Sequence, residues 1–340
     1  MRILITGCGR HSKTLIECMK NNPDGLPLSV IGINNSEKNI LRTGVDEYYI
    51  APSIFDPAYI GWLLALCEEK KVDVILPYIT SELPIAAENK SLFEEKGIKV
   101  SVSSAKSLAI ANNKAEMAKL FPQYMPKQIV AHSSRDIRAF AKKMGYHTGF
   151  PLCCKLADRC GGTGFAILDE RKYLEISSFN KVGVNRYISL NQLCEIADKV
   201  DTEIIIQEYI PGVDYSVCVL ADNGKTVYEC GFAGYSMEFG AVTSGEVVMN
   251  EEAYRIAKEV VEKVGLDGNC CFDFIIKKDG TPILLECNPR INASLPFLAK
   301  AGADLAYYRC RQLLGYPLPK ALDIDYGLKM VKYYESHYFK

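Results

Sequence analysis

The chain has 340 residues, of which 48% are apolar and 24% are charged, and its formal net charge is −1. This composition is ordinary for a globular protein of two or three domains. The near-neutral charge gives no indication of a nucleic acid or an anionic membrane as a partner, and no apolar run approaches the length that crosses a bilayer.

The cysteines and the start of the chain predict a cytoplasmic protein. The 13 cysteines lie mostly in apolar stretches such as PLCCKL and NCCFDF, where cysteine behaves as a small apolar residue. Their odd number and their spacing argue against a disulfide framework or a structural zinc site. The apolar part of MRILITGCGR is too short for a secretory signal.

The first 107 residues predict an α/β domain. Strands are expected at 2–6, 28–34, 72–79 and 98–103, and helices at 13–22, 58–71 and 82–97. Continuous apolar strands that alternate with helices are typical of a parallel sheet covered on both faces.

The rest of the chain predicts an α+β arrangement. One helix is expected at 104–121, and strands at 150–157 and 164–169 enclose a glycine-rich loop. Asn223-Gly224 is a strong signal for a hairpin turn. A helix at 250–265, a second hairpin within 270–287 and a helix at 303–319 follow.

The first strand ends in a glycine turn that resembles the start of a dinucleotide fingerprint. Gly7 and Gly9 fit, but Ser12 replaces the third glycine and Asn34 stands where an acid would bind a ribose. A tight structural turn, or a helix N-terminus that lines a substrate cleft, explains the same residues. A nicotinamide cofactor is the weaker alternative.

A lysine followed by glycines indicates a polyphosphate site. Lys155 stands near the end of an apolar strand, and Gly161, Gly162 and Gly164 follow it. Glycines let backbone N–H groups approach an anion closely. Lys114 is a second candidate cation. The alternative is a surface hairpin with a lysine that reaches to solvent.

The stretch IIIQEYIPGVDYSV could bind a nucleoside. Its strand ends at residues 207–210, where unpaired backbone groups can contact the edge of a base, and Asp214 could accept hydrogen bonds from a ribose. A turn that carries a solvated acid explains the pattern equally well.

The stretch CCFDFIIKKDGTPILLECNPR predicts a metal and phosphate site. A two-residue turn at 279–280 would place Asp273 opposite Glu286, and like charges at such a pair are destabilising unless they are neutralised. Mg²⁺ would neutralise them, with Asn288 adding an oxygen and Arg290 binding phosphate on the same face. A carboxyl pair that is salt-bridged to Arg290 or Lys155 is the alternative. A longer loop would shift the expected pairing.

With these motifs in this order, the chain resembles the ATP-grasp superfamily, and most closely one synthetase half of the carbamoyl-phosphate synthase large chain. The resemblance implies a Rossmann-like, pre-ATP-grasp parallel-sheet domain followed by an α+β ATP-grasp fold of two subdomains. The domains would then span residues 1–107, 108–205 and 206–320, with a C-terminal tail at 321–340.

The resemblance also implies roles for individual residues. The ATP phosphates would contact Lys114 and Lys155 beneath a loop with Gly161, Gly162 and Gly164. The adenine would be held by Gln207, Glu208 and Ile210, and the ribose by Asp214. Two Mg²⁺ ions, or Mn²⁺, would bind Asp273, Glu286 and Asn288. The residues with catalytic roles would be Arg290 and Lys155.

The activity implied is phosphorylation of a small carboxylate by ATP, followed by transfer of the acyl group to an amine. A histidine of carbamoyl-phosphate synthase falls on Thr243 here, which disfavours bicarbonate or carbamate as the acceptor. Phosphorylation of those two, and a nucleotide-binding regulator without turnover, are the alternatives, and a homodimer is left open. Candidates for the acceptor pocket are Arg10, His11, Ser12, Asn34, Thr80, Glu82 and residues 236–246.

Overall fold

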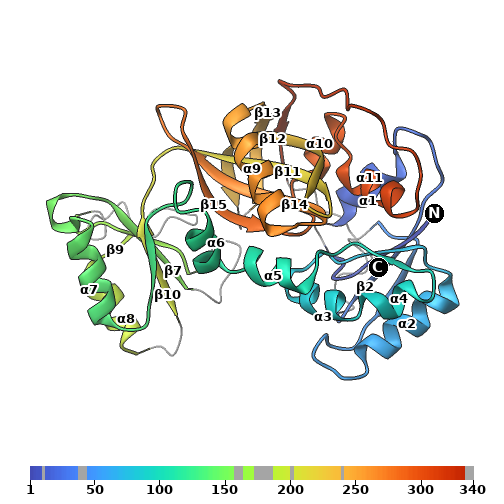
Figure 1. Cartoon of the computed structure of the whole chain (residues 1–340), viewed down its shortest axis with the longest axis horizontal. Helices are drawn as coiled ribbons and strands as arrows, with labels where there is room; N and C mark the ends of the chain where they lie inside the picture. Colours follow the sequence, from blue (N-terminus) through green and yellow to red (C-terminus); the bar gives the residue numbers. More distant parts are fainter. Residues whose placement is uncertain are drawn as a thin grey trace.

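The computed structural model describes residues 1–9, 12–36, 44–156, 164–171, 187–199, 203–238 and 241–333. The strands within these residues form three sheets, which the helices cover (Figure 1). None of the helices in the described ranges is both long and apolar enough to cross a membrane.

The first sheet is entirely parallel, as the alternation of strands and helices predicts. Helices cover both faces of this sheet. Ile3 and Ile5 pack toward α1 (Ser12–Lys20), whereas Leu4 packs toward α2 (Tyr59–Lys70) on the opposite face. The short helices η2 (Thr80–Glu82), α3 (Leu83–Glu88) and α4 (Lys90–Glu94) follow its fourth strand. In spatial order the strands are β3 (Glu47–Ile50), β2 (Ser29–Asn34), β1 (Arg2–Ile5), β4 (Val74–Leu76) and β5 (Lys99–Val100).

Two short helices replace the single helix expected at 104–121. They are α5 (Ala105–Ala111) and α6 (Lys114–Leu120). The Asn113 side chain accepts hydrogen bonds from the backbone N–H groups of Ala115 and Glu116, at 2.9 and 3.1 Å, and so begins a new helix. The expectation of one helix was wrong because this cap was overlooked. The break places Lys114 in the first turn of α6.

The second sheet stands at the end of the molecule opposite the first sheet (Figure 1). Helices α7 (Ser134–Lys143) and α8 (Leu190–Ala197) pack in its core. The domain boundaries expected after residues 107 and 205 fall inside α5 and β10, and β10 pairs on both sides within this sheet, so we place the whole strand there. In spatial order the strands are β6 (Gln128–Ala131), β10 (Ile204–Glu208), β7 (Leu152–Leu156), β8 (Ala166–Leu168) and β9 (Tyr187–Ile188).

The third sheet is antiparallel and contains both expected hairpins. Asn223 and Gly224 form the turn of the first hairpin with positive φ angles of 46° and 85°. Strand β16 lies within the segment expected as a tail. In spatial order the strands are β15 (Pro282–Asn288), β14 (Gly268–Ile276), β11 (Val213–Asp222), β12 (Lys225–Glu238), β13 (Ala241–Val247) and β16 (Lys329–Val331).

The third sheet shares a hydrophobic core with the first. On one face, α9 (Glu251–Val264) covers the strands; on the other, α10 (Leu295–Lys300) and α11 (Leu305–Leu313) pack together with α1 and β1. Figure 1 shows α11 beside α1, although they are far apart in the sequence. The first and third sheets are therefore joined through these helices, and a hydrogen bond between Arg290, which follows β15, and Thr80, which follows β4, connects the two parts.

Candidate active site

Strands β14 and β15 bring three of the expected metal ligands together. Asp273 faces Glu286 across the two strands. The Asn288 amide donates hydrogen bonds to Asp273 Oδ2 at 2.9 Å and to Glu286 Oε1 at 3.2 Å. Two carboxylate oxygens therefore converge on one point, as the sequence predicts.

The predicted pairing is confirmed, but for a different reason. The turn is longer than two residues: Lys277 N donates to Thr281 O at 3.0 Å across residues 278–280. This loop shifts the pairing near the turn by one residue, so that Ile276 faces Pro282. A β-bulge then leaves Leu285 unpaired and shifts the pairing back before Asp273 is reached. The two deviations cancel.

Both expected phosphate-binding lysines reach the same carboxylate. Lys114, at the start of α6, forms an ion pair with Glu286 Oε2, and Lys155 on β7 lies 3.9 Å from the same oxygen. The ion pair with Lys155 that was the alternative interpretation is thus present. Lys114 on α6, Lys155 on the second sheet and Glu286 on the third sheet therefore form one cluster of charged side chains.

The charges of this cluster shift its pKa values strongly. Burial raises the pKa of Asp273 to about 6, and the negative charge of Glu286 adds to the effect. Burial also opposes the charge on Glu286, but Lys114 and Lys155 outweigh it and lower the pKa of Glu286 to about 2. Burial and the neighbouring charge of Lys114 lower the pKa of Lys155 to about 7. A ligand that adds negative charge would stabilise the protonated form of both lysines.

Asp273 is held by residues that the sequence analysis missed. Ser216 donates to Asp273 Oδ1 at 2.7 Å, and the Cys271 thiol contacts the same oxygen at 3.6 Å. Asn292 in turn donates to the Cys271 sulfur at 3.0 Å. Ser216 faces Asp273 across β11 and β14, so only the pairing of those two strands could have revealed it.

These residues fit a hard divalent cation. Mg²⁺ binds oxygen ligands and commonly takes one or two carboxylates from the protein. Rotation of the Asn288 amide would exchange its nitrogen for its oxygen at the point where Asp273 and Glu286 converge, and would release the 3.5 Å contact of Oδ1 with Arg290. No group of three or more His, Cys, Asp or Glu side chains suited to a metal occurs in the described ranges.

Arg290 extends the cluster toward the first sheet. Its Nε donates to Thr80 Oγ1 at 2.9 Å and its Nη1 to the Ile291 carbonyl at 2.9 Å. Its Nη2 lies 3.5 Å from Asn288 Oδ1. The arginine therefore connects the metal-ligand set with η2 of the N-terminal domain.

The other expected nucleotide residues lie at the end of β10, at the start of β11 and in the connection between these strands. Gln207 and Glu208 end β10, and Glu208 Oε2 accepts a hydrogen bond from Lys127 N at 3.5 Å. Ile210 is half-buried in the connection that follows, and Asp214 is exposed at the start of β11. Their contacts with adenine and ribose remain predictions.

The glycine-rich loop is described only at its end. Gly161 and Gly162 lie outside the described residues. Gly164 has a φ of 77°, and a Cβ there would lie 3.1 Å from the Leu156 side chain. Glycine is therefore favoured at this position by backbone conformation as well as by packing.

Several acceptor-pocket candidates gather at the carboxyl ends of the first sheet. Ser12 Oγ accepts from Gly9 N at 2.9 Å, and Asn34 donates to the Cys8 carbonyl at 2.9 Å. Arg10 and His11 lie outside the described residues. Gly7 has a φ of 58°, which gives the glycine turn a structural reason.

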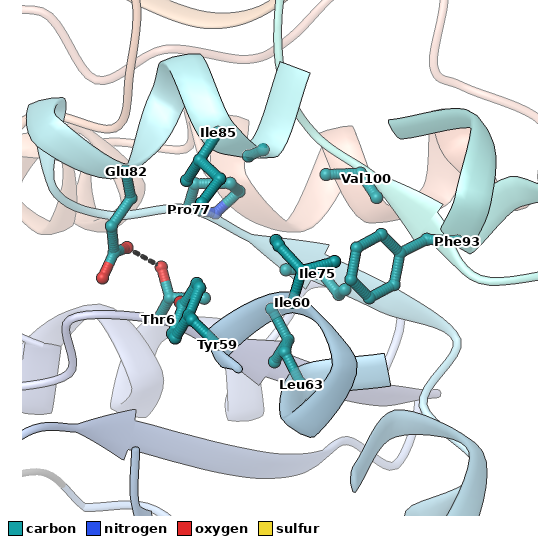
Figure 2. A pocket seen from close by; sticks show the side chains of 11 residues that line it. Thr6, Tyr59, Ile60, Leu63, Ile75, Pro77, Glu82, Ile85, Phe93 and Val100 are labelled. Carbon is teal, nitrogen blue, oxygen red and sulfur yellow. Dashed lines mark hydrogen bonds between the residues drawn. The ribbon is translucent and has the colours of Figure 1, made fainter. Parts of the chain in front are cut away.

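Glu82 is buried beside a small cavity in this domain. Its carboxylate accepts a hydrogen bond from the Thr6 hydroxyl, as Figure 2 shows. Burial raises its pKa to about 7, although the hydrogen bond from Thr6 acts in the opposite direction. The cavity has a volume of about 20 Å³, enough for one water molecule, and its other walls are mainly apolar. A substrate would not fit inside it.

The last acceptor candidates lie on β12 and β13. The Ser236 hydroxyl is 2.7 Å from the Thr243 hydroxyl and 2.8 Å from the Ser244 hydroxyl, and the Tyr235 hydroxyl donates to Glu246 at 2.9 Å. Ser236 is exposed and Thr243 half-buried, so the hydroxyl group of Ser236 is open to solvent. Residues 239–240 are outside the described ranges.

Comparison with known proteins identifies the architecture. Residues 3–101 match the family model described as PylC-like, N-terminal domain, and residues 201–335 match the model described as ATP-grasp in the biosynthetic pathway with Ter operon. N5-carboxyaminoimidazole synthetase from Staphylococcus aureus, solved with ADP, superposes with a TM-score of 0.68 over 95% of this chain and 79% of that chain, at 16% identity. The chain has the ATP-grasp fold. An L-amino acid ligase from Bacillus licheniformis, at 16% identity, superposes on this ATP-grasp chain with a TM-score of 0.63 over 92% of this chain and 74% of that chain.

Curated relatives of this ATP-grasp chain include carbamoyl phosphate synthases. The N-terminal section of the large chain from Methanopyrus kandleri is 23% identical over 324 residues, which cover 89% of this chain and 51% of the relative. The chain therefore spans about half the length of that protein. The large chain from Sulfolobus acidocaldarius is 24% identical over 268 residues, or 72% of this chain and 22% of the relative.

Proposed function

We propose that this protein is an ATP-dependent ligase that activates a small carboxylate as an acyl-phosphate and joins the acyl group to an amine. The observation that carries the proposal is the convergence of Asp273, Glu286 and Asn288 on one point, with Lys114 and Lys155 on the same cluster. Carboxylates that bind a metal, beside cations that bind phosphates, supply what phosphoryl transfer needs.

The first step would transfer the γ-phosphate of ATP. A carboxylate oxygen of the substrate attacks the γ-phosphorus, a new O–P bond forms, and ADP leaves with the electron pair of the broken bond. Lys114 and Lys155 would bind phosphate oxygens, and Arg290 would bind the transferring group through its fork of N–H donors. Asp273, Glu286 and Asn288 would hold two Mg²⁺ ions, or Mn²⁺, which neutralise the charge of the phosphates.

The second step would form the C–N bond. The amine nitrogen attacks the carbonyl carbon of the acyl-phosphate, the C–O bond to phosphate breaks, and inorganic phosphate leaves. The proton that the nitrogen loses passes to solvent or to a base. The adenine and ribose would be held throughout by Gln207, Glu208, Ile210 and Asp214, and the loop with Gly161, Gly162 and Gly164 would cover the phosphates.

The names of the similar structures support this reaction class. One is an L-amino acid ligase, and another is a biotin carboxylase domain dimer from Hydrogenobacter thermophilus, solved with MgADP and bicarbonate. We extend nucleotide and Mg²⁺ binding to this chain as part of the proposal, with a homodimer as one candidate assembly. Sedimentation of the purified chain would measure that assembly.

The second candidate function is phosphorylation of bicarbonate or carbamate. Its support is the similarity to carbamoyl phosphate synthase over 89% of the chain. Thr243 disfavours it, because the corresponding residue in that family is a histidine.

Release of inorganic phosphate from ATP tests these alternatives. Panels of amino acids and organic acids are supplied with and without amines, and products are identified by mass spectrometry. We expect release that needs one carboxylate and Mg²⁺, and that is lost in Asp273→Asn. Stimulation by bicarbonate alone would support the second candidate instead. If no substrate in the panels causes phosphate release, the result would support a nucleotide-binding regulator.

A further inference from the structure

The Arg290 side chain is fixed by contacts that leave part of its fork free. Three of its N–H groups are used within the described part of the chain, by Thr80 Oγ1, the Ile291 carbonyl and Asn288 Oδ1. A guanidinium has five N–H groups, so these contacts leave one N–H group on each terminal nitrogen without a partner among the described residues. Each of the two can donate to an oxygen of a phosphate.

Thr80 is the partner of Arg290 that comes from another domain. The Ile291 and Asn288 contacts are to close neighbours in the sequence, whereas Thr80 is 210 residues away. An unrestrained arginine side chain samples many rotamers, and each fixed point removes part of that freedom. The Thr80 contact fixes Nε, and with Nη1 held by the Ile291 carbonyl it defines the plane of the guanidinium.

The turn that carries Thr80 is itself held in place. It is η2 (Thr80–Glu82), and the Glu82 carboxylate at its end accepts the hydrogen bond from Thr6 at the end of β1. Just before η2, the Ile79 side chain fills the space over Gly7, where a Cβ would lie 2.0 Å from Ile79 Cγ1. Thr80 is thus presented to Arg290 from a turn that is anchored on both sides to the segment after β1.

We infer that Thr80 is a positioning residue, whose hydroxyl holds Arg290 with its free N–H groups turned toward the γ-phosphate of ATP. The inference rests on the proposed function, because it assumes that Arg290 contacts this phosphate. It adds that the N-terminal domain contributes directly to the geometry of the phosphate site. Thr80 acts through Arg290 and does not touch the nucleotide.

Equilibrium binding of two nucleotides to the full chain tests this inference. ADP and a non-hydrolysable ATP analogue differ by the γ-phosphate, so the ratio of their dissociation constants in the presence of Mg²⁺ reports contacts with that group. We expect Thr80→Val to lower the preference for the analogue roughly tenfold, the size of a hydrogen bond to a charged group. Thr80→Ser keeps the hydroxyl and should restore the preference to within twofold.

The controls separate positioning from a structural role. Ser81→Ala, at an exposed residue of the same turn, should leave the ratio unchanged. A merely structural role of Thr80 would lower the melting temperature or weaken both nucleotides equally, with an unchanged ratio, and that result would overturn the inference.

The Arg290→Ala variant separates the inference from the proposed function. If Arg290→Ala abolishes the preference and Thr80→Val retains it, Thr80 does not position the arginine, while the role of Arg290 stands. If Arg290→Ala also retains the preference, the proposed role of Arg290 is wrong and the inference fails with it. If the unchanged chain binds neither nucleotide, the proposed function itself is wrong.

Discussion

At the scale of single residues, Glu286 is the point where the expected site residues meet. One of its oxygens accepts from Asn288, and the other faces Lys114 and Lys155. In this state the charge of the glutamate offsets the repulsion between the two neighbouring lysines. When substrates bind, a metal ion would bind Glu286 and phosphates would neutralise the two lysines.

Glu286→Gln should therefore destabilise the free protein as well as impair the site. The variant leaves the ammonium group of Lys114 and the partly protonated amine of Lys155 without their carboxylate, so we expect the free energy of unfolding at neutral pH to fall by about 2 kcal/mol. Chemical denaturation measures it. ADP should restore part of the loss, since its phosphates supply negative charge.

The exposed Glu262 offers a matched control. Glu262→Gln should change the free energy of unfolding by less than about 0.5 kcal/mol. Equal stability of Glu286→Gln and the unchanged protein would contradict the view that Glu286 holds the two lysines.

The residues of this site were largely predictable, because their signal is local. Asp273, Glu286 and Asn288 lie on two strands joined by a short turn, so they were expected to lie together, although the predicted pairing holds only because the bulge at Leu285 offsets the longer turn. Ser216 and Thr80 were not predictable as partners, because their contacts depend on the pairing of β11 with β14 and on the packing of two domains. Such long-range contacts leave no periodic pattern in a single sequence.

At the scale of secondary-structure elements, features of one or two residues explain where the sequence was misread. Asn113 divides the segment 104–121 into two helices, and an unpaired Leu285 corrects the pairing that the longer turn displaces. Apolar periodicity indicated the right element types at both places. It carries no information about a cap or a bulge, which depend on individual side chains and backbone angles.

The turn η2 carries a buried carboxyl whose protonation should affect stability. The pKa of Glu82 rises from an ordinary value of 4.5 to about 7 on folding, chiefly through burial. The folded state therefore binds the proton more tightly than the unfolded state. Its stabilising contribution is present below pH 4.5 and is lost as the pH rises toward 7.

Glu82→Gln tests this pH dependence. The glutamine is neutral at every pH, so the stability of the unchanged protein relative to the variant should fall by about 2 kcal/mol between pH 5 and pH 8. Denaturant titrations at the two pH values measure the difference. Glu95→Gln, at an exposed glutamate of the same domain, is the control. A difference that does not change with pH would show that Glu82 stays charged in the folded state.

At the scale of the whole molecule, the N-terminal sheet and the third sheet are joined by a shared core and by contacts to a buried ion pair of the C-terminal part. Arg309 is 2% exposed and donates to both carboxylate oxygens of Asp267, at 3.1 and 2.7 Å. Its Nε also donates to the hydroxyl oxygen of Ser101, which follows β5 of the first sheet, at 3.1 Å. The position of η2 relative to Arg290 depends on this arrangement of the two sheets.

Arg309→Met should destabilise the protein strongly. Among the described residues it leaves the buried Asp267 with Lys90, 3.6 Å away, as its remaining ion-pair partner, and we expect a loss of about 3 kcal/mol in the free energy of unfolding. Thermal and denaturant unfolding measure it. The double variant Arg309→Met with Asp267→Asn removes the uncompensated charge and should recover part of the loss. A loss below about 1 kcal/mol in the free energy of unfolding of the single variant would contradict the view that Arg309 stabilises this junction.

The parallel and antiparallel parts of the fold were predicted from alternation and turn residues, but their packing was not. The core that joins β1 and α1 to α10 and α11 connects the two ends of the chain, and each of these elements alone is compatible with many partners. The resemblance to ATP-grasp proteins supplied the order of domains. The boundary inside β10 shows that local pattern does not say which sheet a strand enters.

The most direct test of the central claim is a crystal structure with Mn²⁺ and a non-hydrolysable ATP analogue. Anomalous scattering locates the manganese independently of the model of the protein. We predict manganese bound by Asp273, Glu286 and Asn288, with the γ-phosphate on Arg290 and the other phosphates near Lys114 and Lys155. Manganese or nucleotide bound elsewhere, with Glu286 still paired to the two lysines, would contradict the account.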